Sequence, residues 1–389
     1  MFVDPLFKLM AEKQASDLFF TAGAPIQIKI NGTVMPINNQ ALDPEQVKKI
    51  CYELMTEVQI REFEQKHEMN FAQGGGEMGN FRINIFRQKN TVAMVIRFVK
   101  PDVPALDSLL LPPVLKEVIM EKLGLILIVG STGSGKSTTM ASMIDYRNTL
   151  KTGHILTIED PVEFIFKHKK SIVNQREVRV DTHTYENALI SAMREAPDLL
   201  MVGEIRDRDT LQSALLFAQT GHLCMSTLHA NNSYNALNRI IGFFQRDARE
   251  SLLADLSIAL RCVISQRLVK TIDGKRVAAV EVMLNTKHIQ ELIKGGEINQ
   301  IKEAIEKSLS PGSQTFEQAL FELYRSGRIT MDEALANADS PTNLHWLISN
   351  ATKGGGAPKA PSPAGQGSQP VTDATDDLSS IKLNFDALS

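Results

Sequence analysis

Cysteine is scarce in this sequence. Only Cys51, Cys224 and Cys262 occur among 389 residues, and no two of them form a Cys-x-x-Cys pair. A disulfide framework and a four-cysteine zinc site both need more cysteines at closer spacing, so both are excluded.

Long apolar runs and an excess of basic charge are also lacking. The apolar run at 125–129 is far shorter than the roughly 20 residues that a membrane-spanning helix needs. The segment MFVDPLFKLMAEK contains Asp4 and Lys8 among its apolar residues, so it lacks the apolar centre of a signal peptide. A formal net charge of −3, one tryptophan and 6% aromatic residues are atypical of a nucleic-acid motor or a polybasic membrane anchor. We therefore expect a cytoplasmic protein without a nucleic-acid partner, with peripheral membrane attachment through a partner still open.

The composition nevertheless suits a folded protein of more than one domain. With 43% hydrophobic and 22% charged residues, the chain can bury a sizeable core. Residues 1–100 read as an α+β domain, with a hairpin turn at Asn31-Gly32 and one long helix over 43–67. Two further strands, predicted at 81–88 and 91–99, meet at a short turn. The proline-containing stretch 101–113 is predicted to be a linker.

From residue 114 to about 350 the pattern changes to alternating strands and helices, which is typical of a parallel sheet covered by helices. The region 248–350 is predicted to be mostly helical, apart from a hairpin around 272–275. The strands are predicted at 125–129, 154–158, 198–202 and 223–228.

The segment 351–389 is predicted to be a flexible Pro/Gly-rich tail. Its end nevertheless carries an apolar motif, for which docking onto a partner and a frayed end are both open interpretations. The motif consists of Leu378, Ile381, Leu383, Phe385 and Leu388.

A glycine-rich segment, GSTGSGKST, matches the pattern G-x-x-x-x-G-K-[ST] between a predicted strand and a predicted helix. Its glycines let backbone N–H groups close around phosphate oxygens, and the helix N-terminus adds its positive dipole end. Lys136 would reach the β- and γ-phosphates, and the Ser137 hydroxyl would ligate Mg²⁺. The sequence therefore predicts a nucleotide site made of Gly130, Ser131, Thr132, Gly133, Ser134, Gly135, Lys136, Ser137 and Thr138.

Carboxylates follow two of the predicted strands, where phosphoryl transfer would need them. DLLMVGEIRD carries Glu204 at the end of one strand, and the position before it, where an ordinary Walker B motif has aspartate, is Gly203. Glu204 is therefore assigned to the attacking water. The metal or its water shell is assigned to Ser137 and to the segment ILTIEDPVE, which contains Glu159, Asp160 and Glu163.

His222 and His229 lie at opposite ends of the strand predicted at 223–228 and do not converge on one point by simple alternation. Together with Cys224 they would offer three ligands within one strand, which suits a tetrahedral zinc site poorly. A polar network or a contact with the γ-phosphate is the better interpretation of His229.

Arginines are candidates for neutralising the charge on a transferred phosphoryl group, sometimes from another subunit. Arg82 and Arg97 lie on the two late strands of the first domain. Because strand arginines that alternate with apolar residues are commonly on a solvent face, both interpretations of this pair stay open. The candidates of the second domain are Arg194, Arg206 and Arg239.

Five segments occur in an order and spacing that resemble a known family: GSTGSGKST, TIEDPVEF, NQREV, VGEIRD and TGHLCMSTLHA. Over about residues 1–345 the chain resembles the secretion-type hexameric ATPases, in particular the PilT/PilU family of type IV pilus retraction ATPases. The resemblance implies a PAS-like N-terminal domain, a RecA-like P-loop ATPase domain and a homo-hexamer. It also implies that ATP and Mg²⁺ bind between the N-terminal and core domains of adjoining protomers.

The same resemblance implies residue roles and partners. Glu163 and Glu204 would handle metal and water, His229 would lie beside the γ-phosphate, and Arg82 and Arg97 would reach the nucleotide. The implied partners are a PilT-like retraction ATPase and an inner-membrane platform protein at the pilus base.

Two features are similar to the PilU branch, whose retraction depends on PilT. The segment KHIQELIKG at 287–295 departs from the helix motif usual in the PilT branch, and a tail follows residue 350. An autonomous, PilT-type retraction ATPase stays the alternative. Assembly and type II secretion ATPases typically carry a longer N-terminal region and a four-cysteine insertion. A module that binds ATP only to order its ring would not need Glu204.

Overall fold

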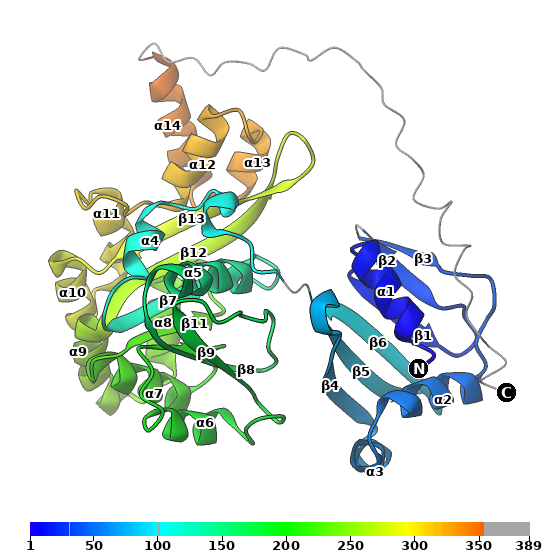
Figure 1. Cartoon of the computed structure of the whole chain (residues 1–389). Coiled ribbons are helices and arrows are strands. Elements are labelled where there is room, and N and C mark those ends of the chain that lie inside the picture. The colour runs from blue at the N-terminus through cyan, green and yellow to red at the C-terminus, as the bar shows by residue number, and fades with distance from the viewer. Residues whose placement is uncertain (31, 100–101, 354–389) are drawn as a thin grey trace. The chain divides into compact units, whose positions relative to one another are not determined.

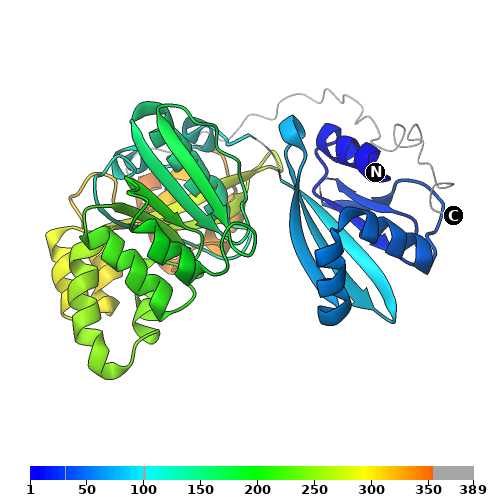
Figure 2. The same cartoon turned by 60° about the horizontal axis from the view of Figure 1, so that its bottom comes forward.

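The computed structural model describes residues 1–30, 32–99 and 102–353, so most of the predicted tail and its apolar motif lie outside the described residues. The chain divides into two compact units. Among the described residues, Met1–Asp102 make up most of the first unit, and Val103–Val162 with residues 166–353 make up the second. Each unit has a sheet and helices of its own (Figures 1 and 2). In the part of the chain that is described, no helix is both long enough and apolar enough to cross a membrane.

The first unit is a six-stranded antiparallel sheet in the order β3-β2-β1-β6-β5-β4. One face of β5 carries the buried residues Phe81, Ile83 and Ile85, which alternate with more exposed ones, so this face holds the core. Phe7 of the first helix stacks on Phe81 with ring centroids 4.0 Å apart. The elements are α1 (Asp4–Glu12), β1 (Asp17–Thr21), β2 (Gln27–Ile30), β3 (Thr33–Pro36), α2 (Pro44–Leu54), α3 (Glu57–Lys66), β4 (Glu68–Gly74), η1 (Gly76–Met78), β5 (Asn80–Gln88) and β6 (Thr91–Val99).

The predicted turn between β5 and β6 is confirmed, whereas the prediction of a single long helix over 43–67 is wrong. Lys89 and Asn90 both have positive φ, 42° and 62°, as a two-residue hairpin turn of the primed type requires. The helix ends at Met55, which is extended, and a new helix begins after Thr56. Thr56 and Gln59 exchange hydrogen bonds as a capping box, which satisfies N–H groups at the start of α3. β4 was missed because its sequence, EMNFAQG, has no β-branched residue.

The second unit is built on a seven-stranded sheet in the order β13-β12-β7-β11-β10-β8-β9, in which every neighbouring pair except β12–β13 is parallel. The strands are β7 (Gly124–Val129), β8 (Gly153–Glu159), β9 (Ser171–Glu177), β10 (Leu199–Val202), β11 (Leu223–Leu228), β12 (Leu260–Lys270) and β13 (Arg276–Leu284). The helices are η2 (Leu106–Leu109), α4 (Val114–Val118), α5 (Lys136–Leu150), α6 (Tyr185–Ala192), α7 (Arg208–Gln219), α8 (Ser233–Gly242), η3 (Arg246–Ala248), α9 (Arg249–Ala259), α10 (Lys287–Lys294), η4 (Ile298–Gln300), α11 (Ile301–Glu306), α12 (Phe316–Arg325), α13 (Met331–Ala336) and α14 (Pro341–Lys353).

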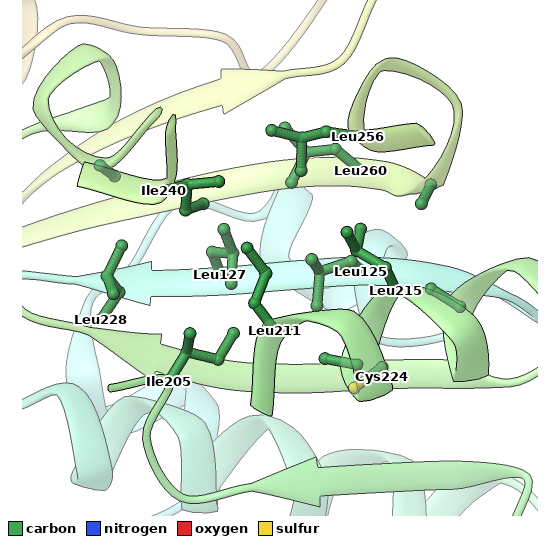
Figure 3. Close-up of a cluster of buried hydrophobic side chains, with 14 of the residues drawn as sticks. Leu125, Leu127, Ile205, Leu211, Leu215, Cys224, Leu228, Ile240, Leu256 and Leu260 are labelled. Atoms are coloured by element: carbon green, nitrogen blue, oxygen red, sulfur yellow. The ribbon is translucent and has the colours of Figure 1, made fainter. Parts of the chain in front are cut away.

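The centre of this sheet is covered on both faces, because all six residues of β7 are buried. Leu125 and Leu127 pack with Leu211 of α7, Ile240 of α8 and Leu256 of α9 in one continuous core (Figure 3). This core holds β7 rigidly, and β7 leads directly into the glycine-rich segment.

The prediction for residues 248–350 was incomplete. The hairpin around 272–275 is present, but its arms are the long strands β12 and β13, and β12 also pairs in parallel with β7. The sequence LRCVISQRLVK does not show this partner, because the pairing joins residues more than 130 positions apart. Helices α12–α14 form a second core with the far part of the hairpin, in which Phe316 and Leu344 pack with Val269 and Val277.

Leu127 provides a test of how far the unit depends on this packing. Leu127→Ala should lower the free energy of unfolding by about 3 kcal/mol, since the side chain is fully buried and its removal leaves a cavity. Leu309, which is 99% exposed, supplies the control Leu309→Ala, with an expected change close to zero. Urea unfolding followed by circular dichroism measures both. Equal midpoints for the two variants would contradict the assignment of this core.

Candidate active site

The loops that carry the predicted motifs leave the same edge of the second sheet. Strands β8, β10, β11 and β7 are consecutive and parallel, so their carboxyl ends lie side by side. In sheets of this kind ligands bind outside the carboxyl ends of the strands. Asp160, Glu204, His229 and the segment 130–138 follow these four strands in turn, which brings the motifs of the second unit to one edge.

The glycine-rich segment connects β7 directly to α5. Gly133 and Gly135 have positive φ, 79° and 87°, a conformation that side chains with a Cβ rarely adopt. Lys136 is buried, and its Nζ donates hydrogen bonds to the carbonyl oxygens of Gly130 at 2.9 Å and Ser131 at 2.8 Å. Its ammonium group thus lies against the loop, where a phosphate would be bound. Ser137 is half-buried in the first turn of α5.

Gln266 of β12 was missed by the sequence interpretation. Its Nε2 donates to the Ser134 carbonyl at 2.8 Å, and its Oε1 accepts from the Thr139 hydroxyl at 2.7 Å. No local signal could have shown this residue, because these bonds span more than 120 positions. Only recognition of β12 as the neighbour of β7 would have indicated it.

The backbone around Glu204 is fixed by both neighbouring strands. The N–H of Gly203 donates to the Ile158 carbonyl at 2.8 Å, and the N–H of Ile205 donates to the Thr227 carbonyl at 2.9 Å. The Thr227 hydroxyl also donates to the Gly203 carbonyl at 2.7 Å. Glu204 therefore projects from a short, rigid connection rather than from a flexible loop.

Steric crowding explains the glycine that stands where a Walker B aspartate was expected. A Cβ on Gly203 would lie 2.8 Å from the Tyr185 hydroxyl oxygen and 3.3 Å from the Ile158 carbonyl oxygen. The Tyr185 side chain is half-buried, and burial raises the pKa of its phenol. An aspartate at this position would have to displace that ring or the strand backbone.

The Glu204 carboxylate contacts two basic side chains and is 16% exposed. Its Oε1 lies 3.2 Å from Nε2 of His229, and its Oε2 accepts a hydrogen bond from Nε of Arg206 at 2.9 Å. The hydrogen bond to Glu204 raises the pKa of the Arg206 guanidinium. A carboxylate held in this way can orient a water molecule for attack on a phosphate, with the imidazole, 39% exposed, beside it.

The segment after β8 adds a second carboxylate, that of Asp160, and β9 anchors the backbone of this segment. Arg206 also lies 3.7 Å from Asp160, and Arg179 lies 3.4 Å from the same oxygen. Glu177 accepts from the Val162 N–H at 3.0 Å, and Gln175 accepts from the Phe166 N–H at 2.9 Å. These two β9 residues belong to the NQREV segment, so that segment shapes the loop that follows Asp160.

The roles assigned to Glu159 and Glu163 in holding the metal or its water shell stay predictions. Glu159 is buried and accepts a hydrogen bond from the Thr157 hydroxyl at 2.7 Å. Glu163 follows in the loop after β8 and is half-buried.

His222 and His229 are separated by the length of β11. His222 lies at its amino end, with its ring 5.5 Å from that of Phe217. Cys224 is fully buried, which raises the pKa of its thiol to about 12. Within the described ranges, no group of three or more histidine, cysteine or acidic side chains is arranged to hold a metal.

Arg82 and Arg97 lie opposite each other on β5 and β6. The Nε of Arg97 donates to the buried Asp17 carboxylate of β1 at 2.9 Å. Their contact with a nucleotide stays a prediction. In the second unit Arg239 supports the histidine loop, since it donates to the His229 carbonyl at 2.8 Å, and Arg194 is exposed.

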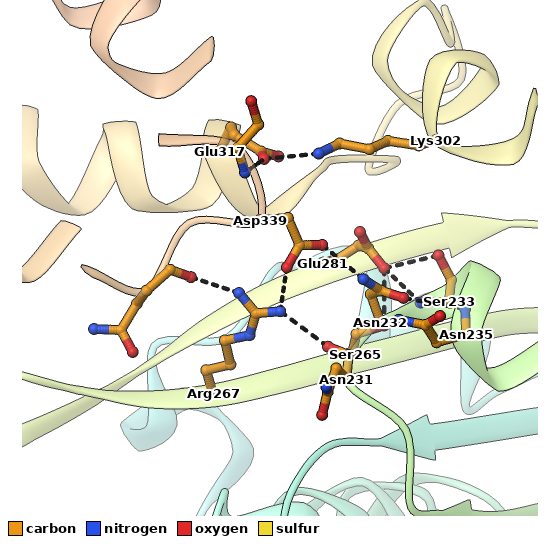
Figure 4. A network of polar contacts seen from close by, with 12 residues as sticks. Asn231, Asn232, Ser233, Asn235, Ser265, Arg267, Glu281, Lys302, Glu317 and Asp339 are labelled. Atoms are coloured by element: carbon orange, nitrogen blue, oxygen red, sulfur yellow. Dashed lines mark hydrogen bonds and ion pairs between the residues drawn. The ribbon is translucent and has the colours of Figure 1, made fainter. Parts of the chain in front are cut away.

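The loop after His229 is tied to the C-terminal helices through Arg267 of β12 (Figure 4). Arg267 donates to the Asn231 carbonyl at 3.2 Å and pairs with Asp339, which in turn accepts from Asn232 at 2.7 Å. The guanidinium lies 3.9 Å from the ring centroid of Phe316. The histidine loop and helices α12–α14 therefore share one polar network.

Glu281 of β13 anchors the start of α8, which follows this loop. It is buried and accepts hydrogen bonds from the Ser233 N–H at 2.8 Å, the Ser233 hydroxyl at 2.7 Å and the Ser265 hydroxyl at 2.9 Å. Burial raises the pKa of the Glu281 carboxyl, although the hydrogen bonds from Ser233 and Ser265 favour its charged form.

Comparison with known proteins shows the family of this chain. A family model described as type II/IV secretion system protein matches residues 1–336. The chain belongs to the type II/IV secretion system protein family.

Two relatives within the secretion family are similar over most of their length. The type IV pilus ATPase PilU of Pseudomonas aeruginosa is 48% identical over 346 residues, which cover 89% of this chain and 91% of the relative. The type IV pilus retraction ATPase PilT of the same organism is 40% identical over 344 residues, which cover 88% of this chain and 100% of the relative.

A solved structure supports the same fold. The crystal structure of the pilus retraction motor PilT with bound ADP superimposes with a TM-score of 0.82 at 41% identity. The match covers 88% of this chain and 98% of that one. The mixed α/β architecture is thus that of the PilT-like secretion ATPases.

Glu281 predicts a pH dependence of stability. Its folded pKa lies above the unfolded value of about 4.5, so the folded state retains the proton after the unfolded state has lost it. Its contribution to stability is therefore complete below pH 4.5 and declines as the pH rises toward the folded pKa. Urea unfolding from pH 4 to pH 8 should show this decline for the wild type relative to Glu281→Gln.

The exposed Glu250 supplies the control for this comparison. Glu250→Gln should follow the wild-type pH dependence. Parallel curves for the wild type and Glu281→Gln would show that the proton on Glu281 does not affect stability.

Proposed function

We propose that this protein is an ATP-hydrolysing hexameric motor for type IV pilus retraction, PilU-like and coupled to a PilT-like ATPase. The observation that carries the proposal is the placement of Glu204 between His229 and Arg206 at the same sheet edge as the P-loop. The similarity to PilU over nine-tenths of both chains supports the pilus role.

The chemistry follows from the residues at this edge. Lys136 and the loop N–H groups bind the β- and γ-phosphates of ATP, and Glu204 orients the attacking water. His229, whose Nε2 lies 3.2 Å from Oε1 of Glu204, would lie beside the γ-phosphate. The Ser137 hydroxyl would ligate Mg²⁺ directly, and Glu163 would contact it through a bound water. This suits Mg²⁺, which usually keeps several waters and binds substrate phosphates with few protein ligands.

The finer architecture is part of the proposal. We assign residues 1–100 to a PAS-like domain, 101–113 to a linker and 114–350 to a RecA-like ATPase domain. The tail, residues 351–389, is assigned to partner docking or to a free end. Arg82 and Arg97 of one protomer would reach the ATP bound by its neighbour, so that hydrolysis moves adjoining protomers against each other. The ring would act in the cytoplasm on an inner-membrane platform protein.

The catalytic role of Glu204 is tested by steady-state ATP turnover of Glu204→Gln. We expect a loss of about a hundredfold or more, because a neutral amide holds the attacking water less strongly than a carboxylate and cannot take up its proton. ADP affinity should be retained, since the P-loop is unchanged. The control is Glu186→Gln on α6, an exposed glutamate with an expected turnover equal to that of the wild type. Equal turnover in both variants would favour a module that binds ATP only to order its ring.

Dependence on a second ATPase separates the PilU-like hypothesis from the PilT-type hypothesis. The 40% identity to PilT supports the PilT-type alternative. The gene should restore twitching motility in cells that lack their own PilU-like protein, but not in cells that also lack PilT. The measurement is the twitching zone on agar. Motility in the doubly deleted cells would establish the autonomous, PilT-type alternative.

A further inference from the structure

The strand pairing places Gln266 directly beside the phosphate-binding loop. The parallel register of β12 and β7 ends at the pair Ser265 and Val129, which is the last residue of β7. The next residue of β12 is therefore adjacent to Gly130, the first residue of the loop. Gln266 is 2% exposed, so its side chain is enclosed at the base of the loop.

Both polar ends of the Gln266 side chain are used there. Its amide nitrogen donates to the Ser134 carbonyl at 2.8 Å, and its amide oxygen accepts from Thr139 at 2.7 Å. Ser134 lies within the loop and Thr139 in the first turn of α5. One amide thus joins the middle of the loop to the helix whose N-terminus completes the phosphate site. A glutamate would place an acceptor opposite the Ser134 carbonyl and could not make both bonds.

The two glycines that define the P-loop pattern both lie against this residue. A Cβ on Gly130 would be 2.5 Å from the Gln266 carbonyl oxygen, and a Cβ on Gly135 would be 2.7 Å from its amide nitrogen. The glycines are therefore required here by the approach of β12 as well as by their own backbone angles.

The Ser134 side chain cannot take over the role of the Gln266 contact in fixing the loop. Its hydroxyl is buried and has no hydrogen-bond partner among the described residues. The Ser134 carbonyl, by contrast, is held by Gln266. The direction of this carbonyl matters, because an oxygen turned toward the phosphates would repel them, whereas the N–H groups attract them.

We propose that Gln266 is a positioning residue for nucleotide binding, which turns the Ser134 carbonyl toward β12 and keeps the loop N–H groups directed at the β-phosphate. The inference rests on the proposed ATPase function but concerns binding rather than hydrolysis. Gln266 acts through the loop backbone, so its loss should weaken the binding of ADP and of ATP alike.

The test compares Gln266→Ala with Gln314→Ala. Gln314 makes the same kind of bond, from its Nε2 to the Val280 carbonyl at 2.8 Å, at a site outside the P-loop. The Kd for ADP, from isothermal titration calorimetry, should rise about tenfold in Gln266→Ala, because a buried carbonyl loses its donor. Gln314→Ala should lower the thermal midpoint and leave the ADP affinity unchanged.

The kinetics distinguish positioning from a general loss of structure. In Gln266→Ala the KM for ATP should rise about tenfold and kcat should stay within about threefold of the wild type, the pattern of a lost binding interaction. An unchanged ADP affinity in Gln266→Ala, or an equal loss in Gln314→Ala, would overturn the proposal. If the wild type binds ADP but does not hydrolyse ATP, the proposed function fails and the ADP affinities still decide this inference.

A second variant covers the case in which Gln266→Ala does not fold. Thr139→Val removes the hydroxyl that orients the Gln266 amide and retains the amide itself. The Kd for ADP should then rise about threefold, since one of two anchoring bonds is lost. A wild-type Kd in a folded Thr139→Val protein would contradict the proposal.

Discussion

The parallel pairing of β7 with β11 on one side and β12 on the other is the constraint on which the site depends. Because β7 is buried on both faces and bonded along both edges, its end is fixed, and the loop that follows begins from a rigid point. The pairing with β11 places His229 at the same edge. The pairing with β12 brings Gln266 against the loop and Arg267 against the loop that follows His229.

At this edge acidic and basic side chains alternate, and each one contacts the next. Glu204 contacts His229 and Arg206, and Arg206 continues to Asp160. In a partly buried setting such contacts are stronger than on an open surface, because water screens them less. The carboxylate that the proposed reaction needs is thus held in place by His229 from the loop after β11 and by Arg206 from its own loop.

Much of this arrangement could be predicted because its signals are local. The P-loop pattern contains its own glycines, lysine and hydroxyl, and the turn at Lys89-Asn90 depends on two residues that accept positive φ. Glu204 was identified because a carboxylate at a strand end is visible in the sequence. The helix break at Met55 also had a local signal, the Thr56 and Gln59 capping box, which the prediction of one helix over 43–67 did not use.

The remaining features depended on contacts between distant segments. No local pattern marks β9 as the strand that anchors the Asp160 loop, and the glycine at 203 is explained only by the Tyr185 hydroxyl and the Ile158 carbonyl that lie against it. The sequence by itself determined the chemistry: which residues can bind phosphate, orient water and neutralise charge. The tertiary structure decided which of them meet, because pairing between strands that are separated along the chain sets the neighbours of each loop, and the sequence near each loop carries no record of that pairing.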